Sequence, residues 1–387
     1  MAKKAINAVF VGGILLLLLA GLARTVFFPK EVNSLEQRYA EQIAPLTGEG
    51  WLKGSFQDSV DKALSDQVQL SETYKKIYNT VSSRFLKAVS APILSQCRDR
   101  YVNIAGTLMF NDNIVYAPFS LEEMAPSLDA KADNLNEYFA AHRSLDFYVY
   151  YLERDIDLDF ETGARVGARE YFLDQLDLPE DRIACLRVDS FEEFSARYLR
   201  TDHHWNYAGA YQGYTELVKL LGVDEPALVP QGGPVQVGTL YGSRSTGMTS
   251  AFSETFYAYR FDYPDMEITD NGYPVDDYGR QNEFLSGNGD WLTYGGFYGW
   301  DEGEVHFDTN RPERENLLIL GESYDNAVVK LLASHFNNTY AVDLRNYEPH
   351  LGKDFQFSDY VEEHDITKVL LIGCMTYFRM DEFALEG

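Results

Sequence analysis

The sequence has 387 residues, of which 45% are hydrophobic and 24% are charged, a composition typical of a folded globular protein. Its formal net charge of −27 disfavours nucleic acid and anionic lipid surfaces as partners, because both are themselves anionic. The three cysteines, Cys97, Cys185 and Cys374, are far apart and include no C-x-x-C pair, which disfavours a zinc knuckle or a dithiol redox site.

The N-terminus predicts export. The run "AINAVFVGGILLLLLAGLA", residues 5–23, carries no charge. At about 1.5 Å per residue a helix of this length spans about 28 Å, close to the thickness of a bilayer core. Two lysines precede the run, and Arg24 and Lys30 follow it, so the charge bias towards an internal N-terminus is modest. We expect residues 1–30 to be a single-pass signal-anchor. Cleavage after Ala23 is the alternative, and both outcomes export the remainder.

Residues 31–95 predict a helical stalk or entry segment. In residues 34–43 and 55–89, apolar side chains recur at three-to-four spacing between many polar ones, as in amphipathic helices. Several glycines separate these two segments.

From about residue 96 to residue 387, strands and helices alternate, which predicts one α/β domain. A hairpin signal, "NDN", lies between two apolar runs at 101–110 and 113–119. Ser120 with Glu123, and Ser190 with Glu193, have the spacing of capping boxes. The elements expected up to residue 222 are a helix through about 142, a strand over 145–153, a helix over about 161–176, a strand over 183–189, and helices over 191–199 and about 207–221.

Residues 225–310 are rich in Gly, Tyr, Asp and Pro, and we expect an irregular insert with short strands. The C-terminal part is regular again and follows a β-α-β-α-β order, which predicts a parallel sheet flanked by helices. Its expected elements are strands over 316–320, 339–344 and 368–373 and helices over 323–336 and about 355–364.

Two segments carry candidate chemistry, and the first is "TDHHW", residues 201–205. Asp202 and His204 flank one residue, so a single loop can present a carboxylate to an imidazole and fix its tautomer. A helix cap with surface histidines is one alternative. A metal site is another, although adjacent histidines on an extended segment point to opposite sides. The string also resembles that of the DHH phosphoesterases, but no histidine follows Tyr294-Gly-Gly-Phe297 where those enzymes have one.

The second segment is "GESY", residues 321–324, which follows a predicted strand. A serine at the carboxyl end of a parallel strand stands where the active sites of open α/β sheets collect. Ser323 is therefore a candidate nucleophile, and an ordinary helix N-cap is the alternative. Glu322 should point away from the pocket, because a negative charge beside a nucleophile opposes further negative charge.

Together the two segments resemble the DHHW family, which is related to the alginate O-acetyltransferases AlgX and AlgJ of the SGNH hydrolase superfamily. "TDHHW" matches the T-D-x-H-W motif and "GESY" the G-x-S-Y motif. Weaker matches are "GTLYGSRS" at 238–245, "YGG" at 294–296 and "VDLRNY" at 342–347. The Asp/His pair precedes the serine, the permuted order of the alginate-type enzymes.

The resemblance implies a serine-based mechanism without metal or cofactor. Ser323 is the nucleophile, His204 the base, Asp202 its orienting carboxylate, and the residue between these two a spacer. The backbone N–H of Ser323 is expected to donate to the oxyanion, with Gly296 as a second donor. Three more residues are candidates for substrate binding, each with a structural alternative: Tyr324 and Trp205 (packing) and Arg345 (a surface ion pair).

The resemblance implies a polysaccharide O-acetyltransferase, anchored in the cell membrane with its catalytic domain outside the cytoplasm. Its partners would be a polysaccharide acceptor and an acetyl donor, supplied through a membrane-bound O-acyltransferase. An exported carbohydrate esterase or deacetylase with the same triad is one alternative. A non-catalytic glycan-binding assembly protein is another, suggested by the Tyr-rich and Gly-rich insert.

Overall fold

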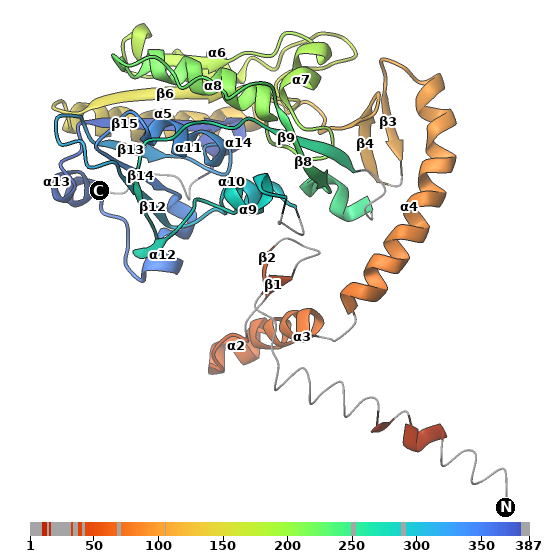
Figure 1. Ribbon diagram of the computed structural model, residues 1–387. Coiled ribbons are helices and arrows are strands. Elements are labelled where there is room, and N and C mark those ends of the chain that lie inside the picture. Colours follow the sequence, from red (N-terminus) through yellow and green to blue (C-terminus); the bar gives the residue numbers. More distant parts are fainter. Residues whose placement is uncertain are drawn as a thin grey trace, which may run out of the picture. The chain divides into compact units, whose positions relative to one another are not determined.

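The computed structural model describes residues 10–13, 15–16, 32–33, 38–40, 43–67, 71–104, 106–248, 253–287 and 292–380 (Figure 1). The chain divides into two compact units, one of Met1–Val89 with Ser245–Phe252, the other of Ser90–Arg244 with Ser253–Gly387. The expected signal-anchor falls almost entirely outside the described residues. Among the helices that are described, none is both long and apolar enough to cross a membrane.

The first unit is mainly helical. It holds α2 (Gly48–Lys53), α3 (Ser55–Gln67) and most of α4 (Ser71–Gln96), in agreement with the helical periodicity. The helix expected over 34–43 is wrong, because β2 (Arg38–Tyr39) pairs there with β1 (Val32–Asn33). A helix of about ten residues is marginal without tertiary packing, so local periodicity alone does not secure it.

The second unit is built on an eight-stranded mixed sheet of order β11-β10-β12-β14-β13-β15-β6-β7. Five neighbouring strands are parallel, which confirms the predicted parallel sheet: β14 (Asn338–Val342), β13 (Leu317–Leu320), β15 (Lys368–Cys374), β6 (Asp146–Leu152) and β7 (Ile183–Leu186). The other three are antiparallel: β10 (Glu267–Asp270), β11 (Tyr273–Val275) and β12 (Glu304–Asp308). The sequence predicts short strands here, but not that they extend the main sheet.

Two smaller sheets complete the strands of this unit. β3 (Tyr101–Ile104), β4 (Thr107–Phe110) and β5 (Asn113–Ile114) form an antiparallel sheet whose β4–β5 turn is the predicted hairpin. Asn111 in that turn has a φ of 53°, a conformation that asparagine tolerates better than most residues. β8 (Val235–Leu240) pairs with β9 (Glu254–Ala258).

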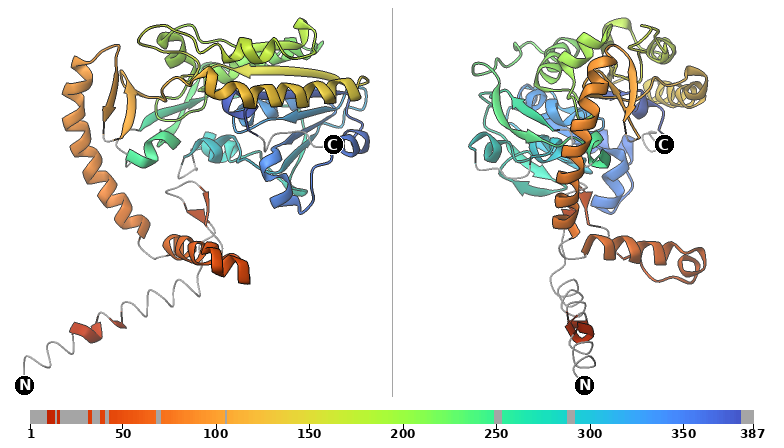
Figure 2. Two further views of the ribbon diagram at one scale, coloured as in Figure 1. Left: turned by 180° about the vertical axis from the view of Figure 1, so that it is seen from behind. Right: turned by 90° about the vertical axis from the view of Figure 1, so that its right-hand side faces the viewer.

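Helices cover both faces of the sheet, and Figure 2 shows α5 running alongside β6. The bounds are α5 (Leu121–Ala141), α6 (Ala168–Leu173), α7 (Phe191–Arg197), α8 (Tyr207–Leu220), α9 (Gln281–Leu285), α10 (Tyr294–Tyr298), α11 (Asn326–Ala333), α12 (Leu344–Leu351), α13 (Phe357–Glu363) and α14 (Met375–Phe378). Because strand side chains alternate, Leu317 and Ile319 of β13 pack with α8 and α11, whereas Leu318 and Leu320 pack with α5 and α13.

One helix is shorter than the sequence predicts. The sequence predicts a helix over about 161–176, but α6 begins at Ala168. Gly163 and Gly167 have φ angles of 72° and 79°, a left-handed backbone that interrupts a right-handed helix. The helix therefore starts only after the second glycine.

Candidate active site

Three side chains from two distant loops meet at the carboxyl edge of the parallel strands. His204 Nε2 lies 2.7 Å from Ser323 Oγ, and His204 Nδ1 lies 2.6 Å from Asp202 Oδ1. Asp202 and His204 are 2% and 6% exposed, whereas Ser323 is half-buried and reachable. His204 and Ser323 are 119 positions apart in the sequence. The fold joins them with Asp202 through hydrogen bonds, and we call Asp202, His204 and Ser323 the row.

Ser323 stands in a tight turn between β13 and α11. Helix α11 takes Asp325 as its N-cap, so Ser323 is not the cap that the simpler interpretation of the sequence would make it. The Ser323 N–H makes no hydrogen bond within the described residues and so remains available to an oxyanion. Gly321 is required by the turn, because a Cβ there would stand 2.2 Å from Asp325 Oδ2.

Asp202 is fixed by backbone donors and a neighbouring loop. The Ser243 N–H donates to Asp202 Oδ2 (2.7 Å), and the Gly242 N–H donates to Thr201 Oγ1 (3.2 Å). Glu254 accepts from the Thr201 hydroxyl at 2.7 Å. Although burial opposes ionisation, the His204 imidazole holds the pKa of Asp202 well below its usual range, so this carboxyl is ionised at neutral pH.

The two adjacent histidine rings point to the same side. Their centroids are 3.9 Å apart, which corrects the expectation that His203 and His204 face opposite ways. That expectation assumes an extended segment, whereas residues 201–204 form a bend. His203 Nδ1 lies 2.8 Å from Ser243 Oγ, so His203 supports the loop as well as spacing Asp202 from His204.

The aromatic neighbours of the triad are packing residues. Trp205 is completely buried, and its indole N–H donates to the Tyr294 hydroxyl at 3.2 Å. Tyr294 stacks on the His204 ring with centroids 3.7 Å apart. Tyr324 is 1% exposed, and its hydroxyl donates to the His203 carbonyl. Trp205 and Tyr324 are both buried, which favours the packing alternative, and a role in substrate binding stays a prediction.

Two further predicted site residues, Gly296 and Arg345, have partners within the fold. The Gly296 N–H donates to Thr293 Oγ1 (2.8 Å) as part of the cap of α10, which disfavours Gly296 as the second oxyanion donor, and that role stays a prediction. Arg345 pairs with Asp343 at 2.5 Å and with Asp301 at 3.1 Å. Its charge is neutralised there, which favours the ion-pair alternative over acidic-sugar binding.

A cavity of about 380 Å³ opens beside the row, and we call it the Arg154 cavity; its lining residues are Tyr116, Phe119, Arg154, His203, Glu322 and Thr376. Glu322 therefore faces the cavity, contrary to the expectation that it points away. Burial raises the pKa of Glu322, and the Cys374 thiol donates to its Oε1 at 3.1 Å. The raised pKa lessens the charge conflict with the neighbouring serine, whereas the hydrogen bond from Cys374 favours the charged form.

Arg154 is the main residue that the sequence interpretation missed. It follows the apolar strand β6, and its Nη1 donates to the Tyr324 hydroxyl at 3.2 Å. The signal was present: Glu-Arg-Asp comes directly after seven strand residues, and charges at strand ends collect at the same sheet edge as Ser323. Ser243 and Tyr294 lie in the weaker motifs, whose sequences alone do not indicate their supporting roles.

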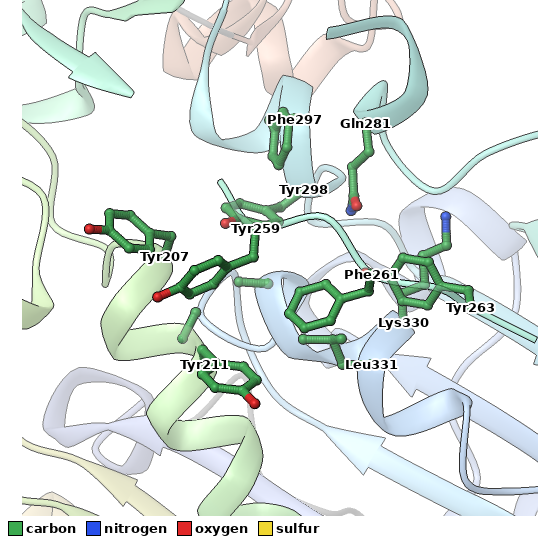
Figure 3. A pocket seen from close by; sticks show the side chains of 12 residues that line it. Tyr207, Tyr211, Tyr259, Phe261, Tyr263, Gln281, Phe297, Tyr298, Lys330 and Leu331 are labelled. Atoms are coloured by element: carbon green, nitrogen blue, oxygen red, sulfur yellow. The ribbon is translucent and has the colours of Figure 1, made fainter. Parts of the chain in front are cut away.

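A second pocket lies away from the triad. It is lined largely by aromatic residues of α8, α10 and the chain after β9, including Tyr211, Tyr259, Phe261 and Tyr298 (Figure 3). Its interior holds only about 20 Å³, roughly the room of one water molecule. Tyr298 lines this narrow pocket and not the Arg154 cavity.

Asp202, His203 and His204 are also the group within the described ranges whose ligand atoms could converge on a metal ion. Three of the four ring nitrogens already have hydrogen-bond partners, however. His204 Nδ1 and Nε2 face Asp202 and Ser323, and His203 Nδ1 faces Ser243. Binding an ion would break at least one of these hydrogen bonds, so the residues fit a proton relay better than a metal centre.

Fold and site together define an α/β protein with a serine–histidine–aspartate row at the carboxyl edge of a largely parallel sheet. Residues 186–342 match the family model described as "DHHW protein". The resemblance to the DHHW family is therefore confirmed over these residues. No curated protein matches the chain significantly.

Solved structures share the fold at low sequence identity. PatB1 of Bacillus cereus, in a structure with a sulfonyl adduct, is 20% identical with a TM-score of 0.56, and the match covers 73% of this chain and 98% of that one. A DHHW family protein of Eubacterium siraeum is 18% identical with a TM-score of 0.53, covering 73% and 92%. The O-acetyltransferase domain of Pseudomonas putida AlgJ matches more weakly, with 13% identity, a TM-score of 0.38, and coverage of 70% and 91%.

Proposed function

We propose that this protein is an acyltransferase that acetylates hydroxyl groups of an exported or cell-wall polysaccharide through an acetyl-serine intermediate. The observation that carries the proposal is the row Asp202–His204–Ser323, with contacts of 2.6 Å and 2.7 Å. A carboxylate, an imidazole and a hydroxyl at these separations can activate the hydroxyl as a nucleophile.

In the proposed first half-reaction, His204 Nε2 takes the Ser323 proton while Ser323 Oγ attacks the acetyl carbonyl of a donor. The ionised Asp202 holds the proton on His204 Nδ1 and stabilises the imidazolium that forms. The free Ser323 N–H supports the developing oxyanion, and the donor's leaving group departs with the proton from His204.

In the second half-reaction, a sugar hydroxyl gives its proton to His204 and attacks the acetyl carbon. The bond to Ser323 Oγ breaks, and Ser323 recovers its proton from His204. The SGNH assignment, the membrane anchor at residues 1–30, the helical stalk over 31–95 and an extracytoplasmic location belong to the same proposal, as does acetyl supply through a membrane-bound O-acyltransferase. The uncharged run of residues 5–23 supports the anchor.

The first test is loss of ester turnover. Ser323→Ala, His204→Ala and Asp202→Ala should each lower the release of p-nitrophenol from p-nitrophenyl acetate by about a thousandfold or more, because the three residues act as one unit. Ser253→Ala, a serine outside the row, is the matched control. Undiminished turnover by the Ser323 variant would end the proposal.

Covalent trapping gives a second readout of the same test. PatB1, which shares the fold, is known with a sulfonyl adduct. An aryl sulfonyl fluoride should modify this protein once, and mass spectrometry of the peptides should place the label on Ser323. A label on another residue, or no label, contradicts Ser323 as the nucleophile.

An exported esterase with the same row is the second candidate, favoured by the half-buried Ser323, whose neighbour Glu322 lines an open cavity that water can enter. Incubation with an acetyl donor and an oligosaccharide separates the two. Acetylated sugar supports transfer, whereas free acetate alone supports hydrolysis. A glycan-binding protein without catalysis would turn over no ester, and a metal enzyme would lose activity with a chelator.

A further inference from the structure

The Arg154 cavity has the dimensions of a ligand site, and its walls are of two kinds. Its volume of about 380 Å³ falls in the usual range for small-molecule pockets, roughly 300–1,000 Å³. Tyr116 and Phe119 are aromatic, whereas Arg154 and Glu322 are charged or ionisable. Because Glu322 directly precedes Ser323, a molecule bound here lies next to the proposed nucleophile.

The aromatic wall is rigid and partly open. The guanidinium carbons of Arg244 and Arg154 lie 4.5 Å and 5.6 Å from the centroid of the Tyr116 ring, cation–π contacts that hold the ring in place. Arg244 is itself fixed by Asp155 at 2.7 Å. Tyr116 is nevertheless 51% exposed, so the rest of the ring remains open to a ligand. A fixed, exposed aromatic face suits the C–H face of a sugar ring.

The polar floor is built from buried groups. Arg154 is only 4% exposed, its Nε pairs with Asp155 at 3.1 Å, and its Nη1 donates to Tyr324. Its Nη2 has no hydrogen-bond acceptor among the described residues, so one donor is left for a ligand. Glu322, 9% exposed and held by Cys374, lines the same cavity.

Arg154 is basic and Glu322 is acidic, and together they restrict the charge of the ligand that can bind. A carboxylated sugar would meet Glu322, which would then have to keep its proton, and an amino sugar would meet the cationic guanidinium of Arg154, so each binds at a cost. A neutral sugar avoids both conflicts. Its hydroxyl groups accept from Arg154 and either donate to or accept from Glu322, since a hydroxyl does both.

We propose that the Arg154 cavity is the acceptor subsite of the transferase and selects an uncharged pyranose, stacked on Tyr116 with neighbouring hydroxyls bridging Arg154 and Glu322. This inference rests on the proposed function. A further hydroxyl of the same ring attacks the acetyl carbon of acetyl-Ser323. The new ester bond forms on the sugar, the bond to Ser323 Oγ breaks, and the proton passes through His204 to Ser323.

The test compares three tetrasaccharides with p-nitrophenyl acetate as the donor: cellotetraose, which is neutral, tetragalacturonate, which is anionic, and a chitosan tetramer, which is cationic. The full chain should acetylate cellotetraose at least about tenfold more than either charged acceptor, by mass spectrometry. Equal or greater acetylation of a charged acceptor overturns the inference. Acetate release with no acetylated tetrasaccharide overturns it too, but leaves the row of Ser323 intact.

Variants of residues that line the cavity test whether the acceptor binds there. Tyr116→Ala should lower the ratio of acetylated cellotetraose to free acetate by about tenfold, because the stacking face is lost. Tyr273→Ala, 76% exposed on β11, is the matched control and should leave the ratio unchanged. Glu322→Gln keeps the shape but removes the acidic group, and should raise tetragalacturonate acetylation relative to cellotetraose.

An unchanged ratio in Tyr116→Ala, or an unchanged acceptor preference in Glu322→Gln, contradicts the subsite while ester turnover persists. Complete absence of ester turnover in the parent protein contradicts the proposed function itself, and the inference with it. Thermal unfolding by circular dichroism confirms that each variant is folded.

Discussion

At the scale of single residues, His204 is held on three sides. Asp202 engages Nδ1, Ser323 engages Nε2, and the Tyr294 ring stacks on its face at 3.7 Å. With Asp202 ionised, the shared proton belongs to Nδ1, which leaves the Nε2 lone pair to accept from Ser323. Orientation and tautomer are therefore fixed before any substrate binds.

The isosteric change Asp202→Asn separates charge from shape. An asparagine amide can donate to Nδ1, which would move the imidazole proton to Nε2 and remove the acceptor that Ser323 needs. We expect kcat for p-nitrophenyl acetate to fall by roughly a thousandfold to ten-thousandfold with little change in thermal unfolding. Asp112→Asn, on a side chain that is 72% exposed, is the control. A variant retaining a tenth of wild-type kcat would contradict this role.

The predicted site residues divide according to what a motif can reveal. Asp202, His204 and Ser323 were identifiable because their types and positions in the chain carry chemistry. The roles of Gly296, Arg345 and Trp205 stay predictions, because sequence does not show which donors and charges find partners within the fold. Arg154 depended on knowing that β6 lies two strands from β13, which is a matter of sheet order rather than of local sequence.

At the scale of elements, two glycines of α8 allow this helix to pack closely against Arg197 and Trp205, which precede and follow the Asp202–His204 segment. A Cβ at Gly209 would stand 2.2 Å from the Arg197 carbonyl oxygen, and one at Gly213 would stand 2.5 Å from the Trp205 ring. These positions, four apart, lie on one face of the helix. They let α8 approach Trp205, and hence the Asp202–His204 segment, more closely than side chains would permit.

Gly213→Ala should destabilise the protein even though alanine favours helices by about 1 kcal/mol over glycine. Overpacking against Trp205 costs about 1–3 kcal/mol, so we expect a net loss in the free energy of unfolding measured with urea. Gly233→Ala adds a methyl where nothing lies within 4 Å and serves as the control. Equal or higher stability of Gly213→Ala would show that the Trp205 ring moves aside easily.

Some strands of the sheet could be predicted from the sequence and others could not. The parallel strands β6, β13 and β15 are continuous apolar runs, buried on both faces, and such runs are visible in sequence. The short strands β10 and β12 alternate polar and apolar residues and owe their place to pairing with distant β14. The periodicity of residues within a short strand does not reveal which distant strand it pairs with.

At the scale of the whole molecule, buried carboxyls link stability to pH. Burial, together with the charge of Glu302, raises the pKa of Asp270 to about 7. An aspartate in an unfolded chain titrates near about 3.9, so between roughly pH 4 and pH 7 the folded state keeps a proton that the unfolded state has lost. Stability contributed by this group therefore falls as pH rises through that window.

Asp270→Asn should remove this dependence while keeping an oxygen for the Asn271 amide, which donates to Asp270 Oδ1 at 2.9 Å. We expect the free energy of unfolding to decline less between pH 5 and pH 8 in the variant than in the parent, as measured by urea titration. Asp262→Asn, at an exposed position, is the control. Parallel curves for parent and Asp270→Asn would contradict the linkage.

The position of β15 has a consequence for how the molecule is made. β15, residues 368–374, is the strand that joins β13 to β6, yet it follows both of them in the sequence. A ribosome delivers residues in order, so β6 and β13 cannot be joined within the sheet until β15 has been made. Until then the strand that precedes Ser323 lacks its link to β6, and the proposed row of Asp202, His204 and Ser323 lacks that support.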